Sequence, residues 1–323
     1  MKRLLFISLL LWPGFLTQGQ VFPQDSVSIN SDGIQLGGML MYPENISSAQ
    51  KVPVVLIIQG SGPTDKDGNS NLSTGKNNAL LYVAEALAAE GIASLRYDKR
   101  GMGMSGKSPL IEATLSFDHF IKDAQNWLKY LSSHSQFSKI GVLGHSQGAL
   151  IASIVSQNKE VSALASVAGA GQSIDQIILK QIKDNPFNPA QVYNEAETIF
   201  KKLGNGLKVD SIPPYLNSLF RKDIQPFMSS WMKYDPGVEL KKVKNAIWIV
   251  NGTTDIQVSV EDAASLKAAQ PKANLTIIEG MNHVLKTADE DRNANMATYS
   301  NPDLPLHQEF VKLLKAFFTK ELL

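Results

Sequence analysis

The sequence predicts an α/β fold in which helices cover both faces of a mostly parallel, doubly wound sheet. Three observations support this. Unbroken apolar runs, such as 52–58 and 161–167, are typical of strands buried on both faces of a parallel sheet. Segments with helical spacing of apolar residues, such as 78–90, separate these runs. A third run, 139–143, leads directly into Gly144-His145-Ser146-Gln147-Gly148 and then into a small apolar segment that suits a packed helix.

The composition is that of an ordinary globular protein. The chain has 323 residues, of which 43% are hydrophobic and 19% charged, so it contains enough apolar material for a sizeable core. A formal net charge of +1 gives no reason to expect a nucleic-acid partner. The absence of cysteine excludes disulfides and thiol catalysis. The composition does not indicate an oligomeric state.

Residues 1–19 have the pattern of a secretory signal peptide. A basic start, Met1-Lys2-Arg3, precedes an apolar stretch that is too short to span a membrane. Small residues at Thr17 and Gly19 predict cleavage near Gly19. We therefore expect an exported protein, periplasmic or secreted, with a catalytic domain over 20–323 and no stable membrane association after cleavage.

The first half of the domain is expected to begin with an antiparallel hairpin. Apolar and polar residues alternate over 26–43, and Asp32-Gly33 is a hairpin turn signal. The segments that follow are a strand at 52–58, helices at 78–90 and 117–131, and strands at 92–97 and 139–143.

The second half contains strands and helices separated by an insertion. Strands are predicted at 161–167, 246–250 and 274–278, and helices at 260–269 and 305–322. Between them, residues 172–240 give no strand signal and contain helix-like pieces broken by proline and glycine. This stretch is too long for a crossover loop. We interpret it as a helical cap over the carboxyl ends of the strands, where such sheets bind ligands.

The motif at 144–148 predicts a nucleophile elbow. A strand, a sharp G-x-S-x-G turn and a helix are the context in which Ser146 would project its hydroxyl from a strained backbone. Side chains at Gly144 and Gly148 would collide in so tight a turn, which explains both glycines. The alternative is a glycine-rich turn with an ordinary surface serine.

A serine nucleophile needs a base and an acid that orients the base. In a doubly wound fold these follow in the order Ser, Asp or Glu, His, each after a strand. Of the five histidines, His283 follows the last strand, whereas His145 lies inside the elbow and is expected to point away from the reaction. Asp255 ends the preceding strand, with a helix N-cap as its alternative role. The predicted triad is Ser146, Asp255 and His283.

Two backbone amides are candidates for the oxyanion hole. The N–H of Gln147 follows the nucleophile at a helix N-terminus. The N–H of Ser61 lies in the loop after the first long strand, where Gly60 permits close approach of the backbone to a substrate. The alternative is a plain turn.

Together these residues resemble the α/β-hydrolase superfamily, near its dienelactone-hydrolase-like and serine-aminopeptidase-like exported bacterial esterases. Many members have histidine where Gln59 stands. The resemblance implies an α/β-hydrolase fold, a small-molecule ester substrate and an acyl-serine mechanism of the carboxylesterase type. The matching motifs are Gln59-Gly60-Ser61-Gly62-Pro63-Thr64-Asp65-Lys66-Asp67-Gly68-Asn69, Arg96-Tyr97-Asp98-Lys99-Arg100-Gly101-Met102-Gly103-Met104-Ser105, the elbow, Asn251-Gly252-Thr253-Thr254-Asp255 and Asn282-His283.

Other functions remain open at this stage. A peptidase that removes N-terminal residues would need a carboxylate for the free amine, and the insertion offers Glu195, Glu197 and Asp223. A thioesterase or acyltransferase would use the same triad. A non-catalytic binding protein on this scaffold would usually lack a triad member.

Neither a cofactor nor a metal is expected. Residues 101–106 satisfy G-x-G-x-x-G, and 101–108 satisfy the spacing of a phosphate-binding loop. However, Pro109 follows immediately and no helix signal begins before residue 117, so nucleotide binding is not favoured. Residues 65–69 resemble the start of a calcium loop, but the glycine is misplaced and Lys76 stands where the bidentate Glu should be.

An apolar cluster in the insertion is the candidate acyl pocket. Phe227, Met228, Trp231 and Met232 are spaced to lie on one helical face. If the insertion hangs over the strand ends, this face forms the roof of the active-site mouth and contacts the acyl group. The alternative is that these side chains only pack the cap helices together.

Overall fold

The computed structural model describes residues 21–44, 46, 50–70, 75–106 and 112–323. The expected signal peptide at 1–19 lies outside the described residues, and so does the end of the phosphate-loop-like motif at 107–108. Over the described ranges, no helix combines the length and apolarity needed to cross a membrane.

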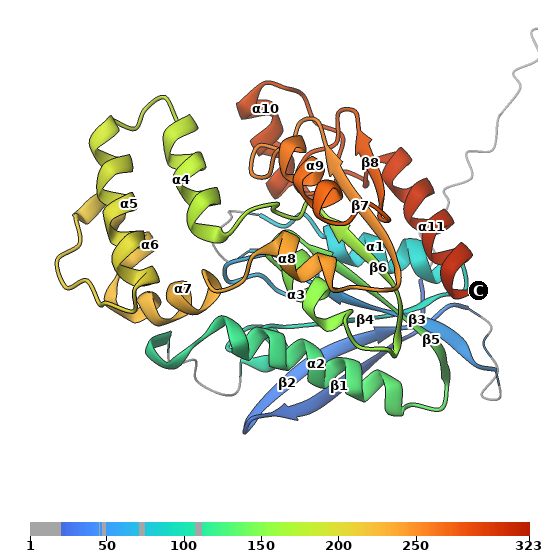
Figure 1. Cartoon of the computed structure of the whole chain (residues 1–323). Helices are drawn as coiled ribbons and strands as arrows, with labels where there is room; N and C mark the ends of the chain where they lie inside the picture. The colour runs from blue at the N-terminus through green and yellow to red at the C-terminus, as the bar shows by residue number, and fades with distance from the viewer. Residues whose placement is uncertain (1–20, 45, 47–49, 71–74, 107–111) are drawn as a thin grey trace, which may run out of the picture.

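The core of the molecule is an eight-stranded sheet with the order β1-β2-β4-β3-β5-β6-β7-β8 (Figure 1). β1 and β2 form an antiparallel hairpin, β2 runs antiparallel to β4, and the remaining neighbours are parallel. The strands are β1 (Gln24–Ser31), β2 (Ile34–Met41), β3 (Val52–Ile58), β4 (Ala93–Tyr97), β5 (Phe137–His145), β6 (Val161–Val167), β7 (Ala246–Gly252) and β8 (Asn274–Ile278).

The N-terminal hairpin and the mostly parallel sheet are as predicted. Asp32 and Gly33 have φ values of 52° and 81°, the left-handed pair that a two-residue hairpin turn requires. Every residue of β3 is buried, and its side chains alternate between the two faces. Val54 and Leu56 contribute to one core, while Val55 contributes to the other.

Helices cover both faces of the sheet. α1 (Ala79–Ala88) and α11 (Gln308–Leu322) pack in the core on one face. α2 (Phe117–Ser133), α3 (Gln147–Val155), α8 (Pro236–Lys241) and α9 (Val260–Ala269) pack in the core on the other. The sequence did not predict α10 (Arg292–Ala297), whose first turn is capped by the Asp291 carboxylate.

The segment between β6 and β7 forms the region that we call the cap. Its helices are α4 (Ile174–Asp184), α5 (Ala190–Gly204), α6 (Asn217–Phe220) and α7 (Gln225–Trp231), and α8 returns the chain to the sheet. Figure 1 shows α4, α5, α6 and α7 standing together to one side of the sheet. They have an apolar core of their own, which includes Phe200, Phe220 and Met228. The cap therefore packs as a small helical unit beside the strands.

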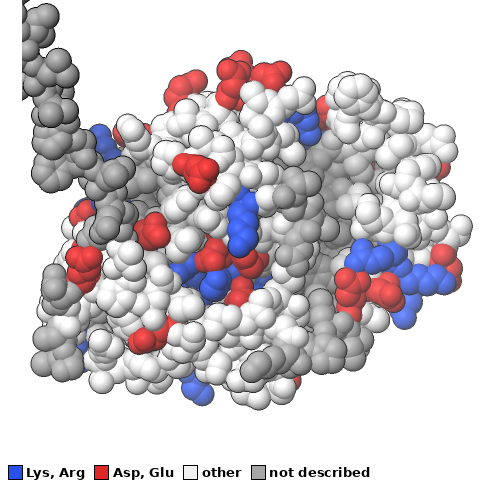
Figure 2. Space-filling view, turned by 180° about the vertical axis from the view of Figure 1, so that it is seen from behind, with Lys and Arg blue, Asp and Glu red and all other residues white. Residues whose placement is uncertain are grey.

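The charged surface is mixed. On the face drawn in Figure 2, basic and acidic side chains of the described residues lie close to one another and do not separate by sign. This arrangement agrees with the net charge of +1. Among the described residues drawn on this face, Lys and Arg do not gather into a large basic patch of the kind that nucleic-acid binding uses.

A buried ion pair fixes the loop after β4. The Arg100 guanidinium donates to both carboxylate oxygens of Asp123 on α2, with N–O distances of 2.6 and 2.7 Å. The hydroxyl of Ser31, at the end of β1, donates to the same carboxylate at 2.5 Å. The loop is thereby attached to α2 and to the hairpin, which holds its other residues, including Lys99, against the strand ends.

We predict that Asp123→Ala lowers the free energy of unfolding by about 3–5 kcal/mol, because the Arg100 guanidinium would stay buried without its carboxylate. The measurement is urea unfolding followed by circular dichroism. The matched control is Glu197→Ala, which removes an exposed ion pair with Lys201 and should cost less than about 1 kcal/mol. Equal losses in the two variants would contradict a special role for the buried pair.

Candidate active site

Ser146 occupies a strained turn between β5 and α3. Its backbone has φ 55° and ψ −121°, which a non-glycine residue rarely adopts. A Cβ atom on Gly144 would lie 2.1 Å from the Gly148 carbonyl oxygen, and one on Gly148 would lie 2.3 Å from that of Ile58. The strained serine and the collision at both glycines are as predicted.

Asp255 and His283 form a buried pair after β7 and β8. The distance from His283 Nδ1 to Asp255 Oδ2 is 2.8 Å, and the Asp255 side chain has no exposed surface. The other carboxylate oxygen, Oδ1, accepts the backbone N–H groups of Gln257 and Val258 at 2.8 and 2.9 Å. Asp255 therefore favours the tautomer with a proton on Nδ1 of His283, which leaves Nε2 free to accept a proton.

The unpredicted helix α10 supports both of these loops. Asn295 donates to the Thr254 carbonyl at 2.8 Å, next to Asp255. Its amide oxygen accepts from Asn282 at 3.1 Å, next to His283. The Asp291 cap at the start of α10 was the sequence signal that could have revealed this helix.

His145 is not among the described residues that line the Ser146 cavity, but it contacts the loop that carries His283. Its Nε2 donates to the His283 carbonyl oxygen at 2.8 Å, and the two imidazole rings lie 4.8 Å apart. Burial lowers the pKa of His145 to about 3, so the ring is neutral near pH 7. His145 thus ties the elbow strand to the loop of His283. Within the described part of the chain, no hydrogen bond joins Ser146 Oγ to His283 itself.

Ser146 opens into a cavity of about 360 Å³ between the sheet and the cap. No residue in its described lining carries a charge. The polar floor is formed by Ser61, Gly62, Ser146 and Gln147. The walls are mainly apolar and include Leu150, Ile174, Ile177, Ile178, Leu219, Ile224, Phe227, Met228, Trp231 and Val258.

Both predicted oxyanion donors lie on this floor. Neither the Ser61 N–H nor the Gln147 N–H donates a hydrogen bond to another described residue, so both remain available. Gly60 lies beside the nucleophile, since a Cβ on it would be 3.2 Å from Ser146 Cβ. Gln59, which stands where many relatives have histidine, donates instead to the Tyr97 carbonyl at 2.8 Å.

The apolar cluster of the cap divides between two environments. Trp231 stacks on Phe117 of α2 with ring centroids 5.3 Å apart, and Phe227 packs edge-on against the same ring. Both of them, with Met228, also line the cavity. The prediction for Met232 is wrong: its side chain packs near Gly204 in the core of the cap, and it is not among the described residues that line the Ser146 cavity.

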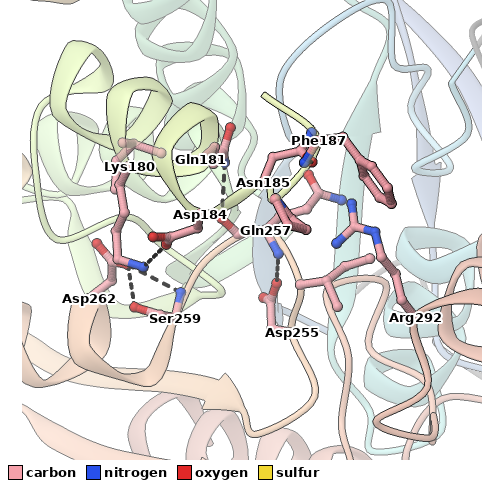
Figure 3. A pocket seen from close by; sticks show the side chains of 13 residues that line it. Lys180, Gln181, Asp184, Asn185, Phe187, Asp255, Gln257, Ser259, Asp262 and Arg292 are labelled. Carbon is pink, nitrogen blue, oxygen red and sulfur yellow. Dashed lines mark hydrogen bonds and ion pairs between the residues drawn. The ribbon is translucent and has the colours of Figure 1, made fainter. Parts of the chain in front are cut away.

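A second, more polar cavity of about 580 Å³ lies beside Asp255 (Figure 3). It shares Ile177, Gln181 and Gln257 with the Ser146 cavity, and at this boundary the Gln181 side chain donates to the Gln257 carbonyl oxygen at 3.0 Å. Lys180 and Asp184 form an ion pair of 2.6 Å on its wall, and Arg292 also lines it. This second cavity could not be predicted, because residues that are far apart in the sequence, from the cap and from the segments after β7 and β8, build it.

In the segment that resembles a calcium loop, the carboxylates of Asp65 and Asp67 bind other groups of the protein. Asp65 Oδ1 accepts the backbone N–H groups of Asp67 and Asn69, both at 2.9 Å. The Asp67 carboxylate is bound by the buried Arg96 guanidinium and by Lys66. These contacts give the segment a structural role in holding the loop after β3.

We predict that His145→Gln makes stability less sensitive to acid. Between pH 6.5 and about 3, unfolded chains protonate this histidine and the folded protein does not, so stability falls as the pH is lowered. At pH 4 this costs the wild type about 3 kcal/mol relative to pH 7, and Gln avoids the cost while keeping an N–H donor for the His283 carbonyl.

The measurement is urea unfolding at pH 7 and pH 4. The control variant is His134→Gln, at the half-buried end of α2, which should retain the acid sensitivity of the wild type. An identical loss of stability in wild type and His145→Gln would contradict the prediction.

Comparison with known proteins agrees with this geometry. Residues 76–290 match the family model described as serine aminopeptidase, S33. Esterase EstD of Thermotoga maritima is 24% identical over 278 residues, which cover 82% of this chain and 60% of EstD. This chain therefore spans less than two thirds of the length of that relative.

Solved structures share the fold at low sequence identity. Est1E from Butyrivibrio proteoclasticus with bound ferulic acid superposes with a TM-score of 0.60 at 21% identity, covering 91% of this chain and 98% of Est1E. The α/β hydrolase GrgF from Penicillium sp. sh18 gives 0.60 at 15% identity, covering 93% of this chain and 99% of GrgF. The family match extends over more than half of the chain, and the protein therefore belongs to the serine aminopeptidase S33 family of the α/β-hydrolase superfamily.

Proposed function

We propose that the protein hydrolyses carboxylic esters through an acyl-enzyme intermediate on Ser146. One observation carries this proposal: the strained serine and two unused backbone amides face an uncharged, largely apolar cavity. The buried Asp255–His283 pair lies on the adjacent loops. This combination supplies a nucleophile, an oxyanion site, a base and a place for an apolar acyl group.

The reaction follows from the role of each group. Ser146 Oγ attacks the acyl carbonyl carbon while His283 Nε2 accepts its proton, and Asp255 stabilises the imidazolium that forms. The Ser61 and Gln147 amides donate to the oxyanion of the tetrahedral intermediate. The C–O bond to the alcohol then breaks, and His283 returns the proton to that alcohol. Water repeats the sequence on the acyl-enzyme and releases the acid.

The contact between Ser146 and His283 is expected to form when a substrate binds. Catalytic hydrogen bonds are often long or misaligned before the substrate is present. The His145 bond to the His283 carbonyl limits how far the two can separate.

The two cavities suggest how a substrate is oriented. The apolar walls above Ser146 favour an acyl chain over a sugar or a charged group. We assign the leaving alcohol to the more polar cavity, which shares Gln181 and Gln257 with the Ser146 cavity. The substrate class is therefore a small-molecule ester with an apolar acyl part.

The relatives support both an esterase and a peptidase. EstD is named an esterase, and the family model is described as a serine aminopeptidase. However, Glu197 pairs with Lys201 on an exposed helix face, and Glu195 is bound by Tyr215. Neither of these residues nor Asp223 lines the Ser146 cavity, so the anchor for a free amine is missing from its described lining.

The same triad would also serve a thioesterase or an acyltransferase. Comparing the rates with oxygen esters and thioesters, and with water and an alcohol as acyl acceptors, separates these activities from an esterase. Export to the periplasm or the medium, proposed from the signal-like segment 1–19, stays a prediction.

We predict that the wild type reacts with a fluorophosphonate probe and hydrolyses p-nitrophenyl butyrate, whereas Ser146→Ala does neither. Loss of the nucleophile should reduce kcat by at least about 10⁴-fold, because only binding and oxyanion contacts remain. Ser133→Ala, at the exposed end of α2, is the control and should behave as wild type. Aminoacyl-anilides are tested beside the esters, and a large preference for anilides would overturn the esterase proposal.

We further predict that Met228→Ala shifts preference toward longer acyl chains and that Met232→Ala does not. Both changes remove a methionine from the cap core, but only Met228 lines the Ser146 cavity. The ratio of kcat/KM for octanoate over acetate esters should rise about tenfold in Met228→Ala, because the shortened side chain deepens the pocket. Equal ratios in both variants would place the acyl group elsewhere.

A further inference from the structure

Lys99 is a buried lysine that reaches both parts of the oxyanion hole. It follows β4 and Asp98, and only 5% of its surface is exposed. Its Nζ donates to the Gly60 carbonyl, to the Gly62 carbonyl at 3.3 Å and to the Gln147 side-chain oxygen at 3.2 Å. The first two acceptors flank Ser61, and the third belongs to the other candidate donor.

The bond to Gly60 acts on the Ser61 amide directly, because the two groups belong to one peptide unit. A trans peptide is planar, and its C=O and N–H point in opposite directions. Once Lys99 holds the Gly60 carbonyl, the Ser61 N–H must point away from Lys99. A hydrogen bond to the carbonyl also polarises the peptide and makes its N–H a stronger donor.

Among the residues that the structure describes, no carboxylate pairs with the charge of Lys99. The neighbouring Asp98 carboxylate accepts the backbone N–H groups of Lys66 and Met104, and Asp123 is bound to Arg100. The facing group on α2 is the Phe120 ring, whose centroid lies 5.1 Å from Nζ. Stability alone does not explain such a residue, since a buried cation can often be replaced by an apolar side chain without loss.

We propose that Lys99 is a positioning residue for the oxyanion hole, which fixes and polarises the Gly60–Ser61 peptide and anchors the Gln147 side chain. This inference rests on the proposed function, because it assigns the Ser61 and Gln147 amides to the oxyanion. Lys99 does not line the cavity, so it acts on the reaction through these two residues.

Three acceptors match the three N–H groups of an ammonium, whereas a neutral amine has only two. Burial lowers the pKa of Lys99 to about 7, with no contribution from a neighbouring charge. Of the titratable groups on adjoining segments, the Asp98 carboxylate accepts backbone N–H groups, Asp123 is paired with Arg100, and His145 stays neutral near pH 7. Loss of the third N–H and of the charge above about pH 7 should therefore weaken the oxyanion hole.

The experiment compares wild type, Lys99→Met, Lys99→Arg and the exposed-lysine control Lys139→Met as full chains. Steady-state kinetics with p-nitrophenyl butyrate and the rate of fluorophosphonate labelling are measured from pH 6 to 9, with Tm for each variant. We expect Lys99→Met to lose about 10²-fold in kcat, comparable with removal of one oxyanion donor, with KM changed less than about threefold. Its Tm should equal or exceed that of the wild type.

The pH profile separates this role from simple packing. Wild-type kcat should fall as the pH rises above about 7, and this alkaline fall should be absent from Lys99→Met. Lys99→Arg keeps its charge at every pH, so it should retain more activity than Lys99→Met and also lose the alkaline fall. Should Lys99→Met fail to fold, Lys99→Arg provides the test through its pH profile.

A crystal structure of Lys99→Met gives a readout that does not need activity. We expect the Gly60–Ser61 peptide to be flipped or disordered, and an unchanged peptide orientation would overturn the proposal. Wild-type kcat in Lys99→Met, or an activity loss that parallels a fall in Tm, would also overturn it. If the wild type neither hydrolyses esters nor reacts with the probe, the proposed function fails, and the peptide orientation still decides the role of Lys99.

Discussion

The site depends on the close packing of α3 against the ends of β3 and β5. A Cβ at position 148 would lie 2.3 Å from the Ile58 carbonyl oxygen, so the first turn of α3 lies directly against the strand that precedes the Ser61 loop. This contact places the Gln147 and Ser61 amides on the floor of one cavity. It also forces Ser146 into its strained backbone, because the chain must reverse from strand to helix within a single residue. The nucleophile and both candidate oxyanion donors are therefore set by one steric constraint.

Much of the fold could be predicted because the central parallel strands are buried and have apolar runs in the sequence. Val52–Ile58 and Val161–Val167 have the same limits in the structure as in the prediction, and so does the largely exposed edge strand Asn274–Ile278. Asp255 and His283 could be found for a related reason: polar residues that follow such runs meet at one edge of the sheet. Their pairing was predicted from the order of Ser146, Asp255 and His283 along the chain, each after a strand.

Contacts between segments distant in the sequence could not be predicted in the same way. Neither the His145 bond to the His283 loop nor the Lys99 bond to the Gly60 carbonyl has a local signature. Met232 shows the limit of helical spacing: the four residues cover a broad helical face, on which Phe227 and Trp231 pack against α2 whereas Met228 and Met232 pack into the core of the cap. Adjacent residues of a helix point about 100° apart, so spacing alone does not say which part of a broad face meets the substrate, and tertiary packing decides it.

The cation nearest the candidate oxyanion hole, Lys99, lies behind the Gly60–Ser61 peptide and does not line the cavity. The lining of the Ser146 cavity is uncharged in the described residues, while Lys99 and Arg100 lie in the loop after β4, where Arg100 pairs with Asp123 of α2. A cation on the cavity wall would be available to a substrate carboxylate and would select for anionic substrates. The Lys99 cation is instead separated from the substrate by the Gly60–Ser61 peptide and acts through the dipole of that peptide. Because a positive charge strengthens an N–H donor without offering a binding group, this arrangement can favour the oxyanion while the walls remain suited to an apolar acyl chain.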